Sequence, residues 1–410
     1  MNIEVLNTGT ELLLGNVVNS HLAYFGRELF PLGLRIQRQV TVPDGSPIRD
    51  ALLEAFARCD ILIVTGGLGP TTDDITREIT AQLLSRRLSE SAEVTAAITA
   101  RLQRRGIPYR ARMQRQAMVP EGATVLPNEN GTAPGLYLPA TQTPSSATPH
   151  LFLLPGPPRE LKPMFEASVI PLLKGIAGTP PSRECRTYHV VGMGESTVEE
   201  VIGLALDARG DLEVGYCARP NEVDFRLIGD AKILDEVEPS VLTALGSHIA
   251  GRDGATLEEG IVGRLIALHQ TVATAESCTG GLLASRITNV PGASEIFHEG
   301  FVTYANESKI RHLGVPAELL EKHGAVSEPV ARAMAEGVVA RSGSNFGVGV
   351  TGIAGPGGGT PEKPMGTVFI AVAQRDGTTE CRHELFPTDR ETFKQLATQS
   401  ALDLLRLKLP

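Results

Sequence analysis

Short apolar stretches of β type alternate with helical patterns from the first residues of this 410-residue chain. Residues 3–6, 34–42 and 61–64 have the composition of strands, and the stretches 20–29 and 46–58 between them have helical periodicity. Alternation of this kind predicts a doubly wound α/β fold, in which a mostly parallel sheet carries helices on both faces. The stretch 61–64 is apolar throughout, which is typical of a strand near the centre of such a sheet.

The second of these helices, at 46–58, has clear start signals in its sequence. Ser46 is expected to be its N-cap, with Pro47 at the first helical position. Its apolar residues Leu52, Leu53 and Phe56 are expected to lie on one side, facing the core. A further helical pattern covers residues 75–87.

Length and composition predict three domains. A chain of 410 residues is too long for one ordinary core. Glycine and proline gather at 174–182, and glycines at 251 and 254 mark a second boundary, so we expect domains over 1–175, 176–252 and 253–410. The middle one has strand patterns at 188–191 and 222–228 around a helical pattern, typical of a small α+β module. Residues 139–149, rich in Thr, Ser, Ala and Pro, predict a solvated surface insertion.

Charge and cysteine content exclude several classes of protein. The net charge of −9 argues against a general nucleic-acid binder. The five cysteines have no paired spacing, which argues against a disulfide scaffold or a zinc site. The chain begins with a strand pattern rather than an export signal, and it has no apolar stretch of about 18 residues. We therefore expect a cytoplasmic protein without a membrane association.

A glycine-rich loop follows the central strand of the first domain, at 65–74. Open parallel sheets bind ligands at the carboxyl ends of their strands, where glycine amides suit phosphate and carboxylates suit a divalent cation. Alternatively, Asp73 and Asp74 only cap the following helix. Two more loops, 130–135 and 155–160, are expected to surround the same pocket. The candidates are Gly66, Gly67, Gly69, Thr71, Thr72, Gly131 and Thr132 for the ligand, and Glu11, Asp73, Asp74 and Glu160 for the metal.

Residues 276–281, Glu-Ser-Cys-Thr-Gly-Gly, lie between a strand pattern and a helical one near the start of the third domain. A hydroxyl at such a turn is exposed on a rigid support, and the helix N-terminus beside it can stabilise negative charge. A serine and a partly buried lysine can act as nucleophile and base, and Ser277 and Lys309 fit this requirement. The alternatives are a serine N-cap with glycines that permit close packing, and a solvated surface lysine.

Other unusual clusters have open interpretations. The segment 351–360 is rich in glycine and follows a strand pattern, so its amides could hold a phosphate, although it lacks the ending of a Walker loop. It is equally typical of a plain loop. Six arginines between 101 and 115 could reach an anionic ligand, but a solvated helix face is the simpler interpretation. His189 is interpreted as structural.

Together these motifs resemble the competence/damage-inducible CinA family over essentially the whole chain. The runs at 9–13, 66–71, 131–135 and 155–160 are similar to its molybdopterin-cofactor-biosynthesis-type domain. Residues 192–196 stand where the family has a KH-like module. The segments 275–281, 304–309, 324–329 and 351–359 resemble its nicotinamide mononucleotide deamidase domain. The implied architecture is an N-terminal doubly wound sheet, a KH-like α+β module and a C-terminal α/β amidohydrolase domain.

The resemblance implies an amidase that converts nicotinamide mononucleotide and water to nicotinate mononucleotide and ammonia, in pyridine-nucleotide recycling. Ser277 would be the nucleophile, Lys309 its base and Tyr304 an orienting or proton-relaying hydroxyl. Thr279 and the amides of Gly280 and Gly281 would stabilise the oxyanion, and no metal is required. The ribose phosphate would be held by Thr351, Gly352, Gly355, Gly357, Gly358 and Arg390.

For the first domain the resemblance implies a metal-dependent ADP-ribose pyrophosphatase with a divalent cation such as Mg²⁺. Fold likeness to molybdenum-cofactor enzymes does not imply their activity. The middle module lacks an evident GXXG-type clamp with basic flanks, so we expect it to link or dimerise domains, in a homodimer, rather than bind RNA.

Two alternatives stay open. A competence or DNA-damage regulatory protein with a vestigial N-terminal site predicts salt-sensitive DNA binding, which the acidic balance disfavours. In the other, Cys278 is the nucleophile, because a thiolate at a helix start is activated.

Overall fold

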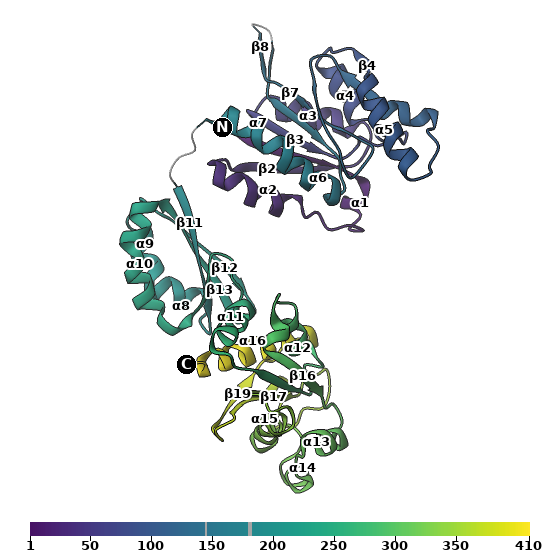
Figure 1. The fold of residues 1–410 in the computed structure, drawn as a ribbon. Helices are drawn as coiled ribbons and strands as arrows, with labels where there is room; N and C mark the ends of the chain where they lie inside the picture. The colour runs from purple at the N-terminus through teal and green to yellow at the C-terminus, as the bar shows by residue number, and fades with distance from the viewer. Residues whose placement is uncertain (144–145, 179–182) are drawn as a thin grey trace. The chain divides into compact units, whose positions relative to one another are not determined.

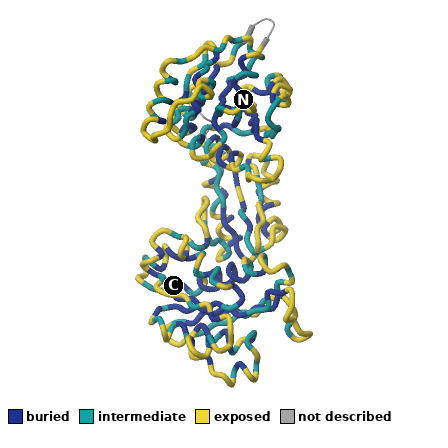
Figure 2. The backbone as a smooth tube through the Cα atoms, turned by 90° about the vertical axis from the view of Figure 1, so that its right-hand side faces the viewer, coloured by how far each residue is buried: buried dark blue, intermediate teal, exposed yellow. Residues whose placement is uncertain are grey.

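The computed structural model describes residues 1–143, 146–178 and 183–410, and the chain forms two compact units, Met1–Ser182 and Arg183–Pro410. Both are layered α/β structures (Figure 1). Buried residues follow the central strands of the sheets, and exposed ones lie toward the outside of each unit (Figure 2). No helix in the described ranges is long and apolar enough to cross a membrane.

The first unit is built on a six-stranded sheet. The pairs β2–β1, β1–β3 and β3–β10 are parallel, and β10–β7 and β7–β6 are antiparallel, so the predicted doubly wound, mostly parallel fold is confirmed. In order across the sheet, the strands are β2 (Ile36–Val42), β1 (Ile3–Thr8), β3 (Ile61–Thr65), β10 (His150–Leu154), β7 (Gly135–Leu138) and β6 (Thr124–Leu126).

Strand β3 is central and buried on both faces, as its composition predicts. Ile61 and Ile63 belong to the apolar cluster on one face, and Leu62 and Val64 to the cluster on the other. This is the alternation that a strand imposes on successive side chains. Helices that pack on the first face are α2 (His21–Leu29), α6 (Pro158–Met164) and α7 (Ile170–Ala177), and those on the second are α3 (Pro47–Phe56) and α4 (Thr76–Leu83).

Two expectations for these helices are corrected. In α3 the core-facing residues are Ile48, Leu52 and Ala55, at i, i+4 and i+7, whereas Leu53 is 43% exposed. One residue is about a 100° turn of the helix, so Leu53 cannot share the stripe of Leu52. Ser46 stands at the N-cap without a side-chain capping hydrogen bond. Helix α4 ends at Leu83, before residue 87, because the chain enters strand β4 (Leu88–Glu90).

The remaining elements of this unit cover its edges. The surface insertion is a hairpin of β8 (Thr141–Thr143) and β9 (Ser146–Thr148), and residues 144–145 of it lie outside the described residues. Of the predicted linker 174–182, residues up to Ala177 belong to α7, and 179–182 lie outside the described part. Short elements complete the unit: α1 (Thr10–Leu13), α5 (Ala92–Arg104) and β5 (Met118–Pro120).

The second unit begins with a four-stranded antiparallel sheet in the order β12–β13–β11–β14, covered by helices, which is the predicted α+β module. Tyr188, Val190 and Phe225 of the sheet pack against Val237 and Val241 of helix α10 (Ala231–Leu245). Its elements are β11 (Arg183–Val191), α8 (Glu195–Val198), α9 (Leu204–Asp207), β12 (Glu213–Arg219), β13 (Glu222–Asp230), α10 (Ala231–Leu245) and β14 (Ile249–Arg252).

The last domain has a five-stranded sheet in which β15 pairs in parallel with β16 and β17, and β18 and β19 follow antiparallel. Its strands are β15 (Val272–Glu276), β16 (Phe297–Val302), β17 (Phe346–Gly352), β18 (Thr367–Gln374) and β19 (Thr379–Leu385). Helices α11 (Leu257–Leu268), α12 (Leu282–Thr288) and α16 (Arg390–Lys408) pack on one face, and α13 (Asn306–Leu313), α14 (Ala317–His323) and α15 (Glu328–Ser342) on the other.

The arrangement of this sheet positions the candidate site. Parallel strands β15, β16 and β17 end at the same edge, so the segments that follow them meet there. Backbone hydrogen bonds connect these segments. Ser277 donates its N–H to Val350 O (3.0 Å), and Thr303 donates its N–H to Glu276 O (2.8 Å). Three stretches far apart in sequence therefore form one edge.

Candidate active sites

The hydroxyl of Ser277 and the amine of Lys309 meet at this edge. Lys309 Nζ lies 3.1 Å from Ser277 Oγ, and it also lies 2.8 Å from Thr303 O and 3.4 Å from Tyr304 O. Lys309 is 1% exposed, although most residues of its helix are polar, whereas Ser277 is partly accessible. The alternative of a solvated surface lysine is therefore wrong.

Burial lowers the pKa of Lys309 from its ordinary value, because the low-dielectric surroundings disfavour the ammonium form. A neutral amine has two N–H donors and one lone pair. The two carbonyl oxygens of Thr303 and Tyr304 can accept the two donors, which leaves the lone pair for the proton of Ser277 Oγ. The contacts of Lys309 thus suit a base that removes the serine proton.

The residue before the serine caps the helix that follows it. Glu276 is 0% exposed, and its carboxylate accepts the N–H groups of Gly281 (2.9 Å), Leu283 (3.1 Å) and Ala284 (2.9 Å). These amides open α12, so the first turn of that helix is capped from inside the protein. The expectation that this helix N-terminus and the amide of Gly281 face the reacting group is therefore wrong. Gly280 donates its N–H to Ser277 O (3.2 Å).

The two residues after the serine differ in chemistry. Burial raises the pKa of the Cys278 thiol to about 12, so the thiolate is not formed near neutral pH. Thr279 is 0% exposed, and its Oγ1 has no hydrogen-bond partner among the described residues. An unpartnered buried hydroxyl is costly unless a ligand supplies the partner, so Thr279 is a better oxyanion donor than Gly281.

Tyr304 lies at the outer rim, where it is 62% exposed. Its hydroxyl accepts a hydrogen bond from Arg390 Nη2 (2.9 Å), and Arg390 Nη1 donates to Gly355 O (2.9 Å). The structure therefore brings Tyr304, Arg390 and the glycine-rich segment together. The proton-relay role of Tyr304 stays a prediction, because the bonding partner of its hydroxyl is Arg390.

Thr351 and the glycine-rich segment form the third side of the serine–lysine site. Thr351 is buried, and its Oγ1 donates to Ala325 O (2.8 Å), which ties the segment at 324–329 to the end of β17. At Gly352 an added Cβ would lie 2.8 Å from Thr367 O, so this glycine has a packing reason. Gly357 and Gly358 are exposed and open, so their amides are accessible to a ligand.

One cation of this site was not predicted from the sequence. Lys394 stands one turn after Arg390 on α16, and its Nζ lies 3.7 Å from where a Cβ on Gly280 would be. Two cations at i and i+4 share one face of a helix. That spacing after the N-cap Asp389 is the sequence signal that could have identified it.

Most of the candidate residues of the first unit line a pocket of about 400 Å³ at the carboxyl ends of β1, β3 and β10. Gly66 and Gly67 have φ values of 98° and 66°, which favour glycine. An added Cβ on Gly67 would lie 2.0 Å from Thr76 Oγ1. The predicted residues that line this pocket are Glu11, Gly66, Gly67, Gly69, Asp73, Asp74, Thr132 and Glu160.

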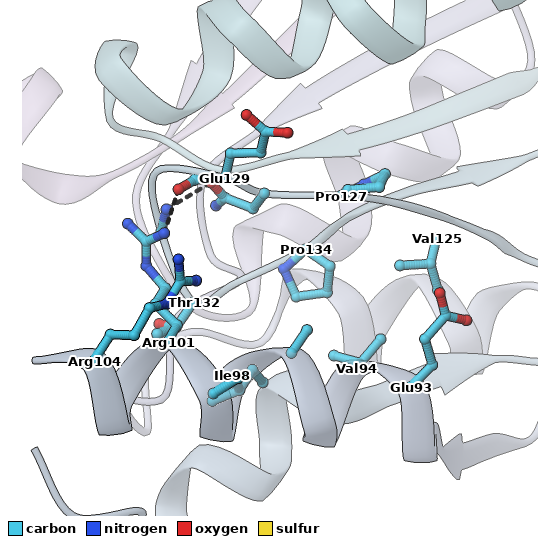
Figure 3. A pocket seen from close by; sticks show the side chains of 14 residues that line it. Glu93, Val94, Ile98, Arg101, Arg104, Val125, Pro127, Glu129, Thr132 and Pro134 are labelled. Atoms are coloured by element: carbon cyan, nitrogen blue, oxygen red, sulfur yellow. Dashed lines mark hydrogen bonds between the residues drawn. The ribbon is translucent and has the colours of Figure 1, made fainter.

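Three predicted ligand residues lie elsewhere. The N–H of Thr71 donates to Asp74 Oδ2 (2.9 Å), and so does its hydroxyl, so Thr71 holds the loop instead of lining the pocket. Thr72 is not among the residues that line this pocket, and Gly131 lines a neighbouring cavity (Figure 3). These positions correct the expectation that all the loop residues contact one ligand.

The carboxylates that line this pocket can hold a divalent cation only if a bound ligand supplies further coordinating atoms. In the described ranges no group of three or more His, Cys, Asp and Glu residues is close enough to hold a metal by itself. Mg²⁺ is commonly held by one or two carboxylates and substrate phosphates, with water completing its shell. Glu11, Asp73, Asp74 and Glu160 around one pocket fit that mode.

These features define a chain of α/β domains with a serine–lysine pair in one and a glycine-loop pocket in another. Three family models match it: a probable molybdopterin binding domain over 4–175, the damage-inducible protein CinA KH domain over 185–249, and the CinA C-terminal domain over 254–409.

Two relatives match more than nine-tenths of the chain, and a solved structure matches a part of it. A CinA-like protein of Akkermansia muciniphila is 48% identical over 98% of this chain and 96% of its own length. A putative competence-damage inducible protein of Symbiobacterium thermophilum is 47% identical over 92% of this chain and 89% of its own. The crystal structure of the competence/damage inducible protein CihA from Agrobacterium tumefaciens is 42% identical, with a TM-score of 0.36, over 37% of this chain and 92% of that one. The chain belongs to the CinA family.

Proposed function

We propose that the last domain hydrolyses the carboxamide of nicotinamide mononucleotide to nicotinate mononucleotide and ammonia. The observation that carries this proposal is the 3.1 Å contact between Lys309 Nζ and Ser277 Oγ in a site where the lysine is buried. A serine with a neutral amine beside it is a nucleophile for acyl transfer.

The chemistry runs in two steps. Ser277 Oγ attacks the carboxamide carbon while Lys309 takes its proton, and the oxyanion lies near Thr279 Oγ1. When the C–N bond breaks, Lys309 returns the proton to the leaving nitrogen, and ammonia departs. Water then attacks the ester on Ser277 with the same amine as base, which releases nicotinate mononucleotide. Arg390, Lys394 and the amides of Gly357 and Gly358 supply cationic and N–H groups for the phosphate.

The test is ammonia release from nicotinamide mononucleotide by purified full-length protein. Ser277→Ala should reduce kcat by about 10³-fold or more, because it removes the nucleophile. Cys278→Ala should leave the rate within about twofold, since its thiol has a pKa of about 12. If the cysteine variant is inactive and the serine variant active, the serine assignment is wrong.

A second activity is supported by the pocket of the first unit. We propose that it hydrolyses the diphosphate of ADP-ribose, with the phosphates on the loop of Gly66, Gly67 and Gly69. The residues that would hold a divalent cation are Glu11, Asp73, Asp74 and Glu160, and such an ion polarises the diphosphate. Chelator should stop AMP formation and leave ammonia release unchanged. Ser277→Ala should leave AMP formation intact.

A further inference from the structure

His189 of β11 is a buried histidine that neither proposed activity uses; it is 8% exposed. Its neighbours Tyr188 and Val190 belong to the apolar core of the middle module. Because successive side chains of a strand point to opposite faces, His189 points to the other face of the sheet. The last domain meets that face, where Gln399 of α16 contacts Glu222.

A carboxylate faces each ring nitrogen of His189. Nδ1 lies 2.6 Å from Asp224 Oδ1, and Nε2 lies 2.9 Å from Glu222 Oε2. An ionised carboxylate only accepts hydrogen bonds, and only the protonated ring has two N–H donors. The bond to Glu222 raises the pKa of His189 above its ordinary value, burial opposes this rise, and the bond to Asp224 adds to it. The two contacts therefore select the charged form.

The charges around His189 balance only in that form. The half-exposed Arg219 of β12 donates to Glu222 Oε1 (3.3 Å) and to Asp224 Oδ2 (2.5 Å), so two carboxylates share one arginine and one histidine. His248 donates its Nδ1–H to Val191 O, a bond that it makes in either protonation state. The charged and titratable groups on the elements around His189 are Glu222, Asp224 and Arg226 of β13, Arg219 and Cys217 of β12, His248 before β14 and Asp253 after it.

Gln399 connects this cluster to the last domain. Its Nε2 donates to Glu222 Oε2 (2.6 Å), the same oxygen that contacts His189. Its Oε1 accepts a hydrogen bond from Arg286 of α12, so a rotated amide would place two acceptors together at one end and two donors at the other. Gln399 is buried. The contact therefore needs Glu222 in the position where His189 holds it.

Two further contacts join the module to α16, and neither titrates near neutral pH. Asn221 donates to Ser400 Oγ (3.1 Å), and Arg406 Nη2 donates to Ser247 O (2.7 Å). Amide and hydroxyl groups do not ionise in this range, and a guanidinium keeps its charge.

We propose that His189 is a pH-sensitive link between the middle module and the last domain. The protonated ring holds Glu222 where Gln399 binds it. When the ring loses its proton, one carboxylate faces a nitrogen lone pair, the repulsion between Glu222 and Asp224 is no longer balanced, and the contact with α16 weakens. The contacts of Asn221 and Arg406 persist, so the module stays attached but is held less firmly.

The direction of the pH effect follows from the two states of the histidine. In the unfolded chain His189 has its ordinary pKa of 6.5, whereas the folded protein keeps the proton to a higher pH. Between these two pH values the folded protein binds more protons, so its stability falls as pH rises. The stability that the link contributes is complete below pH 6.5 and is lost as pH rises through the raised pKa.

The experiment is scanning calorimetry of the full-length protein at about pH 6 and about pH 9. His189→Gln should lower the melting temperature of the second compact unit by about 4 °C at the lower pH and by about 1 °C or less at the higher one. Ser400→Ala, which removes a neutral contact of the same helix, should lower it equally at both and thereby identifies the transition. His248→Gln should keep the pH dependence of the wild type.

Combining His189→Gln with Gln399→Ala tests the link itself. At the lower pH the double variant should lose less than the sum of the two single losses, because both substitutions break one chain of contacts. At the higher pH the two losses should add. If His189→Gln has the same effect at both pH values, or if the losses add at the lower pH, the inference is overturned.

Asp224→Asn is the second variant, in case His189→Gln does not fold. It keeps the shape of the side chain and removes one of the two carboxylates that raise the pKa of His189. The melting temperature of the second unit should therefore fall less between the two pH values than it does in the wild type. An equal fall in this variant would also overturn the inference.

Discussion

Among single side chains, Lys309 combines a structural cost with a clear chemical use. A lysine that is 1% exposed destabilises the fold when it is charged, yet its neutral form is the base that Ser277 needs. Active sites are often less stable than an apolar replacement would be for this reason. Lys309→Met, which keeps the length and apolar stem of the side chain, separates the two effects.

Lys309→Met should lower ammonia release by about 10²–10⁴-fold, since it removes the general base. The variant should also melt at a higher temperature than the wild type at pH 7. In the unfolded chain the lysine keeps its proton up to about its ordinary pKa of 10.5, whereas the folded protein releases it at lower pH. Between these two pH values the unfolded chain binds more protons, so the free energy of unfolding of the wild type rises with pH.

The stability advantage of the methionine variant should therefore shrink as pH rises toward 10.5, as measured by melting temperature from pH 7 to 10.5. Wild-type kcat/KM should rise with pH and level off above the lowered pKa of Lys309. Lys322→Met, at an exposed position of α14, is the control and should show neither effect. A methionine variant at position 309 that is less stable at pH 7 would contradict the assignment of a buried amine.

The sequence identifies Ser277 and Lys309 as a pair, but it does not predict which residues surround them. Ser277 and Lys309 stand in motifs whose residue types suggest their chemistry, so they could be named without a structure. The exposure of Tyr304 and its bond to Arg390 depend on how α16 packs beside the 304–309 segment, and no local pattern records that. The i, i+4 spacing could have placed Lys394 on the same helix face as Arg390, but its position beside Gly280 is a contact across more than a hundred residues.

In helix α12, the sequence suggests a different role for the N-terminal amides from the one that the structure shows. Its N-cap position is Gly281, with no side chain to cap the helix, so the run of glycines suggests amides open to a ligand. The cap instead comes from Glu276, at the end of the preceding strand. Its carboxylate ties β15 to α12 and thereby fixes the loop that carries Ser277. The helix is thus a support for the nucleophile.

Glu276→Gln should destabilise the protein by about 1.5–3 kcal/mol, because hydrogen bonds to a buried charged acceptor contribute about that much. The amide that replaces the carboxylate has one acceptor oxygen and also places an N–H against helix donors. Chemical denaturation measures the change, and hydrogen exchange should quicken in the first turn of α12. Glu299→Gln, at an exposed position of β16, should leave both unchanged. Equal stability of wild type and Glu276→Gln would mean that this carboxylate is no cap.

Across the whole chain, the sequence predicts the helices and strands better than it predicts the contacts between them. The buried strand at 61–64 and the α/β alternation follow from local composition, and both are confirmed. Contacts between the middle module and the last domain are not local. Gln399 donates to Glu222 Oε2 (2.6 Å), and Asn221 donates to Ser400 Oγ (3.1 Å), so the module packs against α16.

That packing predicts how the chain can be divided. The residues that are hydrogen-bonded at the serine–lysine site all lie between 272 and 394. Helix α16 has a further contact with the middle module, because Arg406 Nη2 donates to Ser247 O (2.7 Å). A fragment of residues 183–410, which corresponds to the second compact unit, should keep the ammonia release of the full chain within about twofold. A fragment that begins at residue 254 should melt about 5 °C lower, because α16 loses several hydrogen bonds that contribute about 1 kcal/mol each.

Activity and melting temperature of the two fragments, with and without chelator, check this division. Chelator should change neither fragment, because the carboxylates proposed to hold a cation all lie in the first unit. Gln399→Ala should lower the melting temperature of the 183–410 fragment more than that of the shorter fragment, since the bond to Glu222 exists only in the longer one, whereas the bond from Arg286 exists in both. If the 183–410 fragment folds but releases no ammonia, the deamidase site needs the first unit, and the two activities proposed here are not independent.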